Sequence, residues 1–150
     1  MEDFNKDANL DSFYFPEGTV HQDVYFKMGF LHFVWDRAKS DKCLKERGFD
    51  FQTAAMIFND DDCLYDRDEA HMDGEERLSA LGQPTSEAHS SDTESVPTTY
   101  IGSVNSILYV VYTERAEAGE DLLRIISARR ATPLEKQVYE ENKYQGYDKY

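Results

Sequence analysis

One short charged segment combines residue types that can move protons and hold a phosphate. Residues 68–77 contain His71, Glu75, Glu76 and Arg77, directly before a run with strand-like composition. Cleavage of RNA without a metal ion needs a base for the 2′-hydroxyl proton, a cation for the phosphate and an acid for the leaving 5′-oxygen. His71 suits the base or acid role because the ordinary pKa of histidine is about 6.5. The alternative interpretation is a solvated turn with local ion pairs.

A second group of basic residues lies toward the carboxy terminus. Arg124, Arg129 and Arg130 flank an apolar run, and guanidinium groups offer paired donors that suit phosphate recognition. The alternative is edge charge that balances an acidic protein. The net charge of −14 repels polyanions and by itself argues against a nucleic-acid-binding protein. Residues 104–150, however, carry seven basic and eight acidic groups, so this part of the chain can present a local basic face.

The cysteine and histidine content predicts no metal site and no other cofactor. Cys43 and Cys63 are the two cysteines of the chain and form no CxxC pair, so both are expected to be free thiols. The four histidines are scattered without the spacing of metal ligands: His21, His32, His71 and His89.

The size of the chain predicts a single domain. Of its 150 residues 40% are hydrophobic, which is enough for one core of ordinary size but marginal for two. No apolar run approaches the roughly 20 residues that cross a bilayer, and the amino terminus lacks the basic start and apolar stretch of a signal peptide. We therefore expect a cytoplasmic protein without a membrane contact.

The first half of the chain is expected to contain an arm and two helices. Residues 1–30 mix aromatic and acidic residues and are assigned to an irregular arm, although the run from Val24 to Trp35 favours extended backbone. Asp36 is a good N-cap for a helix over residues 37–47, and Gly48 is a natural end for it. A shorter helix is expected from an N-cap and an apolar stripe at helical spacing: Asp50, then Phe51, Ala54, Ala55 and Phe58.

Short strand-like runs fill the second half of the chain. They are residues 63–65, 77–81, 106–113 and 122–129. Because consecutive strands with short connections favour antiparallel pairing, we expect these runs to form an antiparallel sheet. Residues 83–99 consist mainly of Ser, Thr, Glu, Pro and His, which predicts a mobile inserted loop.

A last helix is expected near the carboxy terminus. The segment from Thr132 to Glu135 is a capping box with proline at the first helical position, so the helix begins there and runs toward Gly146. The predicted fold class is α+β. It is a small antiparallel sheet with two N-terminal helices and one C-terminal helix packed on it, in a single domain over residues 31–145.

Five segments of the chain, taken in order, resemble the BrnT family. They are residues 33–39, Gly48 with Phe51, Ala54, Ala55 and Phe58, residues 71–77, residues 110–115, and residues 124–132 with Glu135. The resemblance covers roughly residues 31–142. The arm and the inserted loop lie outside it.

This resemblance implies a ribonuclease toxin with a RelE-like fold, which a DNA-binding antitoxin of the BrnA type neutralises. By matching motif, it points to Lys39, His71, Glu75, Glu76, Arg77, Arg115 and Arg129. We expect catalytic roles for His71, Glu75, Glu76, Arg77 and Arg129, and RNA-binding roles for Lys39, Arg115 and, from the basic group around it, Arg124. RNA is then the substrate and no metal takes part. The assemblies that fit such a protein are a homodimer and a toxin–antitoxin hetero-oligomer.

The chain departs from the family pattern at the end of the first expected helix. Glu46 stands where the family commonly has a basic residue, and Arg47 stands where it has a histidine. An alternative function is therefore a non-catalytic binding module that keeps the toxin fold and the partner-binding surface. A third is an acidic protein-interaction domain of unrelated role.

Overall fold

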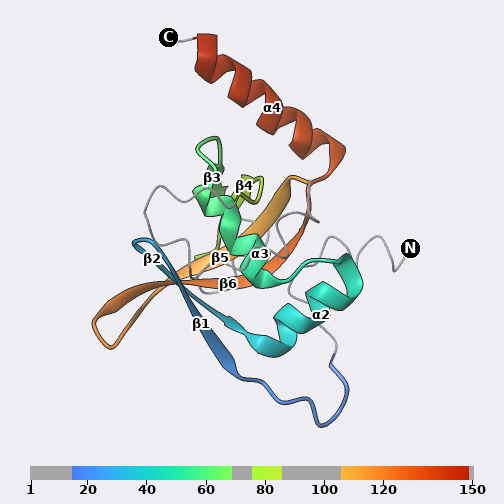
Figure 1. Cartoon of the computed structure of the whole chain (residues 1–150), viewed down its shortest axis with the longest axis vertical. Helices are drawn as coiled ribbons and strands as arrows, with labels where there is room; N and C mark the ends of the chain where they lie inside the picture. Colours follow the sequence, from blue (N-terminus) through green and yellow to red (C-terminus); the bar gives the residue numbers. More distant parts are fainter. Residues whose placement is uncertain (1–14, 69–75, 86–105, 149–150) are drawn as a thin grey trace.

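Six strands join in one mixed sheet. The computed structural model describes residues 15–68, 76–85 and 106–148 of the chain. The strands follow the order β1-β2-β6-β5-β4-β3 across the sheet (Figure 1). Their bounds are Asp23–Met28 for β1, Leu31–Asp36 for β2, Leu64–Arg67 for β3, Leu78–Gly82 for β4, Leu108–Glu117 for β5 and Glu120–Arg130 for β6. Together with its helices, this sheet makes the fold α+β, as the sequence predicts.

The sheet is antiparallel except where β2 pairs with β6. These two strands run parallel, with Phe33 opposite Leu123 and Trp35 opposite Ile125. The prediction of a wholly antiparallel sheet is therefore wrong at this pairing. A parallel pair requires a crossover connection, and the chain provides one because it leaves β2 through helices and forms three other strands before β6.

A β-hairpin occupies the end of the segment expected to be an irregular arm. β1 and β2 pair antiparallel along their whole length, and Gly29 turns the chain between them with a positive φ of 61°. The arm predicted over residues 1–30 is therefore corrected, because residues 23–28 form a strand. Burial of aromatic side chains favours this strand, since the ring centroid of Phe26 lies 5.9 Å from that of Trp35.

The two N-terminal helices lie where the sequence predicts them. Their bounds are Arg37–Arg47 for α2 and Phe51–Ala55 for α3, which continues into the 3-10 turn η1 at Met56–Asn59. Gly48 ends α2 in the left-handed conformation, with φ of 88°, and its amide bonds to the Leu44 carbonyl. Asp50 caps α3 by accepting a hydrogen bond from the Thr53 amide at 2.9 Å.

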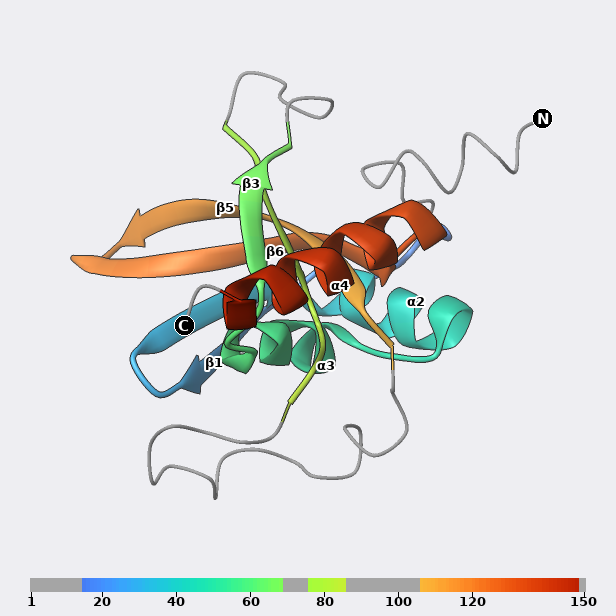
Figure 2. The ribbon, with the colours of Figure 1, turned by 90° about the horizontal axis from the view of Figure 1, so that it is seen from above.

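The core lies between these helices and one face of the sheet, which we call the inner face (Figure 2). Its largest fully buried side chains come from both layers and include Phe33, Phe49, Phe51, Met56, Ile57, Leu108 and Ile125. The predicted apolar stripe faces this core, because Phe51, Ala54 and Ala55 have no exposed surface. The core holds β2 and β6 in place, and the same strands present their alternate side chains on the opposite, outer face.

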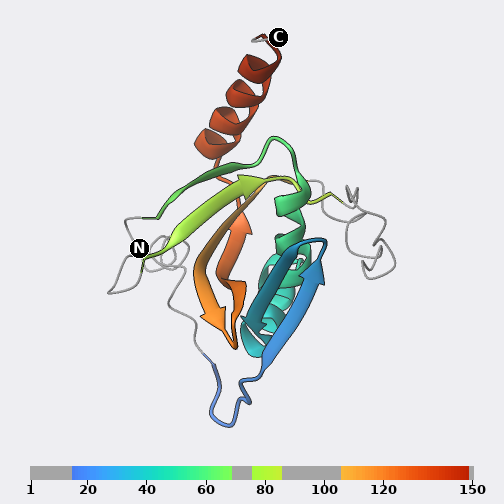
Figure 3. The same cartoon turned by 90° about the vertical axis from the view of Figure 1, so that its left-hand side faces the viewer.

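The C-terminal helix α4 (Pro133–Asp148) meets the sheet through a limited contact. Buried Tyr139 packs beside Leu81, and its hydroxyl donates a hydrogen bond to Asp60 Oδ2 at 2.6 Å. The rest of the helix extends beyond the sheet (Figure 3). Leu134 and Val138 remain exposed. The expected packing of this helix on the sheet is therefore corrected to a contact centred on Tyr139.

The predicted capping box is present at the start of α4. The Thr132 hydroxyl accepts a hydrogen bond from the Glu135 amide at 3.2 Å, and the Glu135 carboxylate accepts one from the Thr132 amide at 2.9 Å. Thr132→Ala removes the first of these bonds and should lower the free energy of unfolding by about 1 kcal/mol. The measurement is the urea midpoint at an unchanged m-value. A midpoint equal to that of the wild-type protein would show that the box does not stabilise the fold.

Candidate functional site

Four of the arginines predicted from the sequence share the outer face. Side chains two residues apart on a strand lie on the same face, and residues that pair across neighbouring strands do so as well. On β6, Arg124 pairs with Thr113 of β5 and Arg129 pairs with Tyr109 of β5, while Arg115 lies on β5 itself, two residues beyond Thr113. Arg77 lies two residues before Ser79 of β4, and Ser79 pairs with Val111 of β5. Val111 belongs to an apolar cluster separate from the inner core, as expected for the outer face.

A pocket of about 450 Å³ opens where β1, β2, β6 and α2 meet. Its charged lining consists of His21, Asp23, Asp36, Lys39 and Arg124. Lys39 and Arg124 are two of the predicted RNA-binding residues, and the fold brings them together from distant parts of the sequence. The pocket thus combines two cations, two carboxylates and one imidazole.

The imidazole of the pocket is fixed by a carboxylate. Nδ1 of His21 lies 2.7 Å from Oδ2 of Asp36, and the other oxygen of Asp36 accepts a hydrogen bond from the Gln22 amide at 3.2 Å. The Phe15 ring and the imidazole meet edge to face, with 4.9 Å between the ring centroids. When Nδ1–H donates to the carboxylate, Nε2 of the neutral ring is left as an acceptor. This arrangement suits general-base chemistry.

Asp36 directs its carboxylate into the pocket although it stands at the N-cap position of α2. Its side chain makes no capping hydrogen bond, and its exposed fraction is 8%. The sequence predicts the cap position correctly. The bonds of its carboxylate, however, go to His21 and to the backbone of the segment before β1.

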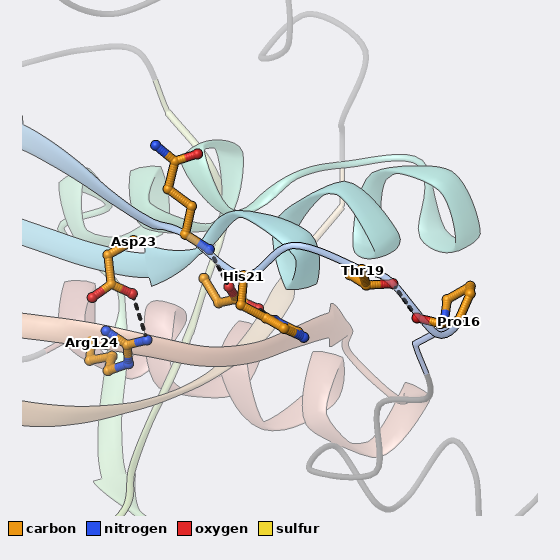
Figure 4. A network of polar contacts seen from close by, with 7 residues as sticks. Pro16, Thr19, His21, Asp23 and Arg124 are labelled. Atoms are coloured by element: carbon orange, nitrogen blue, oxygen red, sulfur yellow. Dashed lines mark hydrogen bonds and ion pairs between the residues drawn. The ribbon is translucent and has the colours of Figure 1, made fainter.

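Arg124 forms the wall of the pocket on β6. Its Nη2 donates to Asp23 Oδ1 at 2.9 Å, a contact that joins β1 to β6 across β2, and Figure 4 shows this pair beside His21. The Arg124 side chain is 20% exposed, and that of Asp23 is 42% exposed. The ion pair therefore holds the guanidinium in a defined position at the pocket, with solvent access to both groups.

Arg129 lies at the other end of β6, about 17 Å along the strand from Arg124. Its two terminal nitrogens donate to the Glu135 carboxylate at 2.8 and 3.0 Å, and its guanidinium lies 4.4 Å from the centroid of the Tyr109 ring. Burial by itself would raise the pKa of Glu135, but hydrogen bonds from Arg129 and from the Thr132 amide outweigh it and lower this pKa. Arg129 therefore also fastens the start of α4 to the sheet.

The other predicted catalytic residues lie away from the pocket or outside the described residues. His71 and Glu75 lie outside the described residues. Glu76 is exposed and forms an ion pair with Arg67 at 3.1 Å, near the β3 edge of the sheet, whereas the pocket lies toward the β1 edge. Arg77 directly precedes β4, which β5 separates from β6. The structure thus separates Glu76 and Arg77 from the pocket that Lys39 and Arg124 line.

The two positions that depart from the family pattern lie at the end of α2. Glu46 pairs with Lys42 at 2.7 Å, and the Arg47 carbonyl accepts a hydrogen bond from Arg130. At 1.5 Å per residue, Arg47 is about 12 Å along the helix from Lys39, so neither position lines the pocket.

The two thiols are free, as the sequence predicts. Burial raises the pKa of Cys43 to about 12 and that of Cys63 to about 12. Because the thiolate is the reactive form, neither cysteine is suited to act as a nucleophile at neutral pH. The pocket is therefore the better candidate for chemistry.

Sequence reasoning missed His21 and the role of Asp36. His21 lies in the predicted arm, outside the BrnT resemblance, and no spacing rule connects it with Asp36. The β1–β2 pairing makes the connection, because it places Asp23 opposite Asp36 and so brings His21, two residues before β1, to the end of β2. The aromatic and β-branched run from Val24 to Trp35 is the signal that predicts this hairpin, once a turn at Gly29 is recognised.

Two features are absent from the described residues. Within the described ranges no group of three or more His, Cys, Asp or Glu residues is placed to hold a metal ion. In the same part of the chain no helix is long and apolar enough to span a bilayer.

Comparison with known proteins adds no assignment. No protein-family model matches the sequence, and no curated protein is significantly similar to it.

Proposed function

We propose that this protein is a metal-independent RNA endonuclease that binds RNA across the outer face of the sheet. The observation that carries this proposal is the gathering of four arginines from distant segments on this face, with Lys39 beside Arg124 in the pocket. The arginines are Arg77, Arg115, Arg124 and Arg129. Guanidinium groups bind phosphate through paired hydrogen bonds, and several of them in a row suit a polyanionic chain. Because the chain carries a net charge of −14, a surface that gathers several cations is unusual for this protein.

The proposed chemistry uses the substrate's own 2′-hydroxyl as the nucleophile. A base removes its proton, the oxygen attacks the adjacent phosphorus, and the bond to the 5′-oxygen breaks. Negative charge builds up on the phosphate oxygens in the transition state, where fixed guanidinium donors stabilise it most. The ion pair of Arg124 with Asp23 supports this reading because it positions the guanidinium before RNA binds.

The biological role that we propose follows from the resemblance to the BrnT family. The enzyme would be a RelE-like toxin of the cytoplasm, and a DNA-binding antitoxin of the BrnA type would neutralise it. Its assemblies would be a homodimer or a toxin–antitoxin hetero-oligomer. A small neighbouring open reading frame that encodes a DNA-binding protein would support this role over that of an unrelated acidic interaction domain.

A non-catalytic binding module is the second candidate function. The observation in its favour is that both terminal nitrogens of Arg129 are engaged by Glu135, which a phosphate must displace. In this case the toxin fold and the partner-binding surface persist without cleavage. Glu46 and Arg47 would then mark where activity was lost, and replacing them with Lys and His would restore it.

The test is RNA cleavage by the purified protein, freed of any partner, in the presence of EDTA. We expect cleavage of a labelled single-stranded or structured RNA at a rate that EDTA does not change. Arg77→Ala and Arg129→Ala should slow it by about 100-fold if the scissile phosphate lies beside these residues, and should weaken RNA binding with little change in rate if they hold RNA away from the point of cleavage. Lys45→Ala, which removes an exposed cation on α2, is the matched control and should leave the rate nearly unchanged. Tight binding of a partner with no cleavage in EDTA would favour the binding module.

A further inference from the structure

We propose that His21, held by Asp36, is the general base of the reaction, so that cleavage takes place in the pocket between β1, β2, β6 and α2. This inference rests on the proposed ribonuclease function and goes beyond it. His21 lies outside the part of the chain that resembles a known family, and the predicted proton-transfer group, His71, is a different residue.

The geometry gives His21 the arrangement of an oriented base. Asp36 is nearly buried and uses both carboxylate oxygens, one toward His21 Nδ1 at 2.7 Å and one toward the Gln22 amide at 3.2 Å. A carboxylate fixed in this way selects the tautomer in which Nδ1 carries the hydrogen and Nε2 accepts a proton. It also stabilises the imidazolium that forms when the base takes that proton.

The surroundings of the imidazole suit a phosphodiester. Lys39 from α2 and Arg124 from β6 line the same pocket, so the phosphate next to the attacked ribose meets two cations. The charged groups that line the pocket with His21 are these two, Asp36 from β2 and Asp23 from β1. The volume of about 450 Å³ lies within the range of small-ligand sites, roughly 300–1,000 Å³. The pocket therefore holds a base and phosphate donors together.

A purely structural role for the His21 side chain is weakly supported. The segment before β1 is already attached by the backbone, because the Arg37 amide donates to the Gln22 carbonyl at 2.7 Å and the Gln22 amide donates to Asp36. The His21 side chain is 52% exposed, and an exposed polar contact adds little to stability. The bond between the imidazole and Asp36 is thus better placed to orient the ring than to fasten the chain.

The proposed step balances without an added reagent. His21 Nε2 takes the proton of the 2′-hydroxyl, the 2′-oxygen bonds to phosphorus, and the bond from phosphorus to the 5′-oxygen breaks. The 5′-oxygen takes a proton from water, and the imidazolium returns its proton to solvent. The products are a 2′,3′-cyclic phosphate and a 5′-hydroxyl, and nothing is oxidised or reduced.

The test compares His21→Ala with His32→Ala in the full-length protein. His32 is the matched control because Nδ1 of this histidine also lies beside a carboxylate, 3.5 Å from Glu120 Oε1, but outside the pocket. We expect His21→Ala to slow cleavage in EDTA by about 100-fold or more, and His32→Ala to stay within about threefold of wild type. Both variants should keep the wild-type thermal midpoint and RNA affinity.

Three readouts separate a base from a merely structural residue. The acidic limb of the pH–rate profile should disappear in His21→Ala, added imidazole should restore part of its rate, and Asp36→Asn should lower the rate while RNA binding remains. If His21→Ala keeps the wild-type rate and pH profile, or imidazole gives no rescue of a folded but inactive variant, His21 is not the base. If the wild-type protein cleaves RNA beside these variants, the ribonuclease function remains supported whatever the role of His21. Absence of cleavage by the wild type would overturn both proposals.

Discussion

Replacing Arg124 by alanine should lower the rate of RNA cleavage by about 100-fold or more, which corresponds to a loss of about 2.7 kcal/mol of transition-state stabilisation. Arg124 lies on the wall of the pocket, where its ion pair with Asp23 positions the guanidinium. A lysine keeps the charge but not the paired donors, so Arg124→Lys should recover only part of the rate. The measurement is single-turnover cleavage in EDTA at saturating protein.

The control for this substitution is Asp23→Asn, because Arg124→Ala also breaks the contact between β1 and β6. Asp23→Asn weakens that contact but keeps the guanidinium. If the effect of Arg124 is on the phosphate, Asp23→Asn should lose much less of the cleavage rate than Arg124→Ala and should bind RNA at least as tightly. Equal losses in both variants, together with equal drops in thermal midpoint, would show that Arg124 acts by holding the hairpin to the sheet.

Phe33→Ala should lower the free energy of unfolding by about 3–5 kcal/mol. Phe33 has no exposed surface, and its ring packs at the centre of the inner face, with centroid distances of 6.3 Å to Phe26 and 5.2 Å to Phe58. Alanine removes these contacts and leaves a cavity that a close-packed core refills only in part. Because small domains are stabilised by only about 5–15 kcal/mol, this one substitution should remove a large share of the stability.

Phe30 provides a matched control on the same hairpin. Its side chain is fully exposed at the turn between β1 and β2, so Phe30→Ala should change the free energy of unfolding by no more than about 0.5 kcal/mol. The measurement for both variants is urea unfolding followed by the fluorescence of Trp35. Similar midpoints for Phe30→Ala and Phe33→Ala would contradict the placement of Phe33 in the core.

Local chemistry explains which elements were predictable from the sequence. The end of α2 at Gly48, the cap of α3 at Asp50 and the box formed by Thr132 and Glu135 each depend on residues within one helical turn. Such signals are complete in the sequence because the interacting groups are neighbours in it. The same is true of the apolar stripe of α3, which identifies its buried face without knowledge of the sheet.

Long-range pairing explains what the sequence did not predict. Nothing near β2 indicates that it pairs parallel with β6, since that choice depends on how the whole chain crosses the core. The contact of Tyr139 with Asp60 likewise joins residues far apart in the sequence, and this contact sets where α4 leaves the sheet. Local amphipathic patterns report which residues are buried but not which element covers them.

The candidate site likewise combines features that the sequence predicts with features that depend on long-range pairing. Lys39 and Arg124 could be proposed from their residue types and from the resemblance, whereas their meeting in one pocket depends on the β2–β6 pairing. His21 could not be proposed at all, because its partner Asp36 becomes its neighbour only when the β1–β2 hairpin forms. A histidine in a segment without a regular period carries no signal until its contacts are known.

The chemical ends of the RNA products report most directly on whether this protein cleaves RNA through the 2′-hydroxyl. The measurement is mass spectrometry of a short RNA after incubation in EDTA, beside the same oligonucleotide with 2′-deoxy sugars and beside Arg124→Ala protein purified identically. We expect a 2′,3′-cyclic phosphate or 3′-phosphate on one product and a 5′-hydroxyl on the other, no cleavage of the deoxy substrate, and a much slower reaction with Arg124→Ala. Intact RNA in every reaction, equal cleavage of the deoxy oligonucleotide, or equal rates for the wild-type and Arg124→Ala proteins would contradict the proposed function.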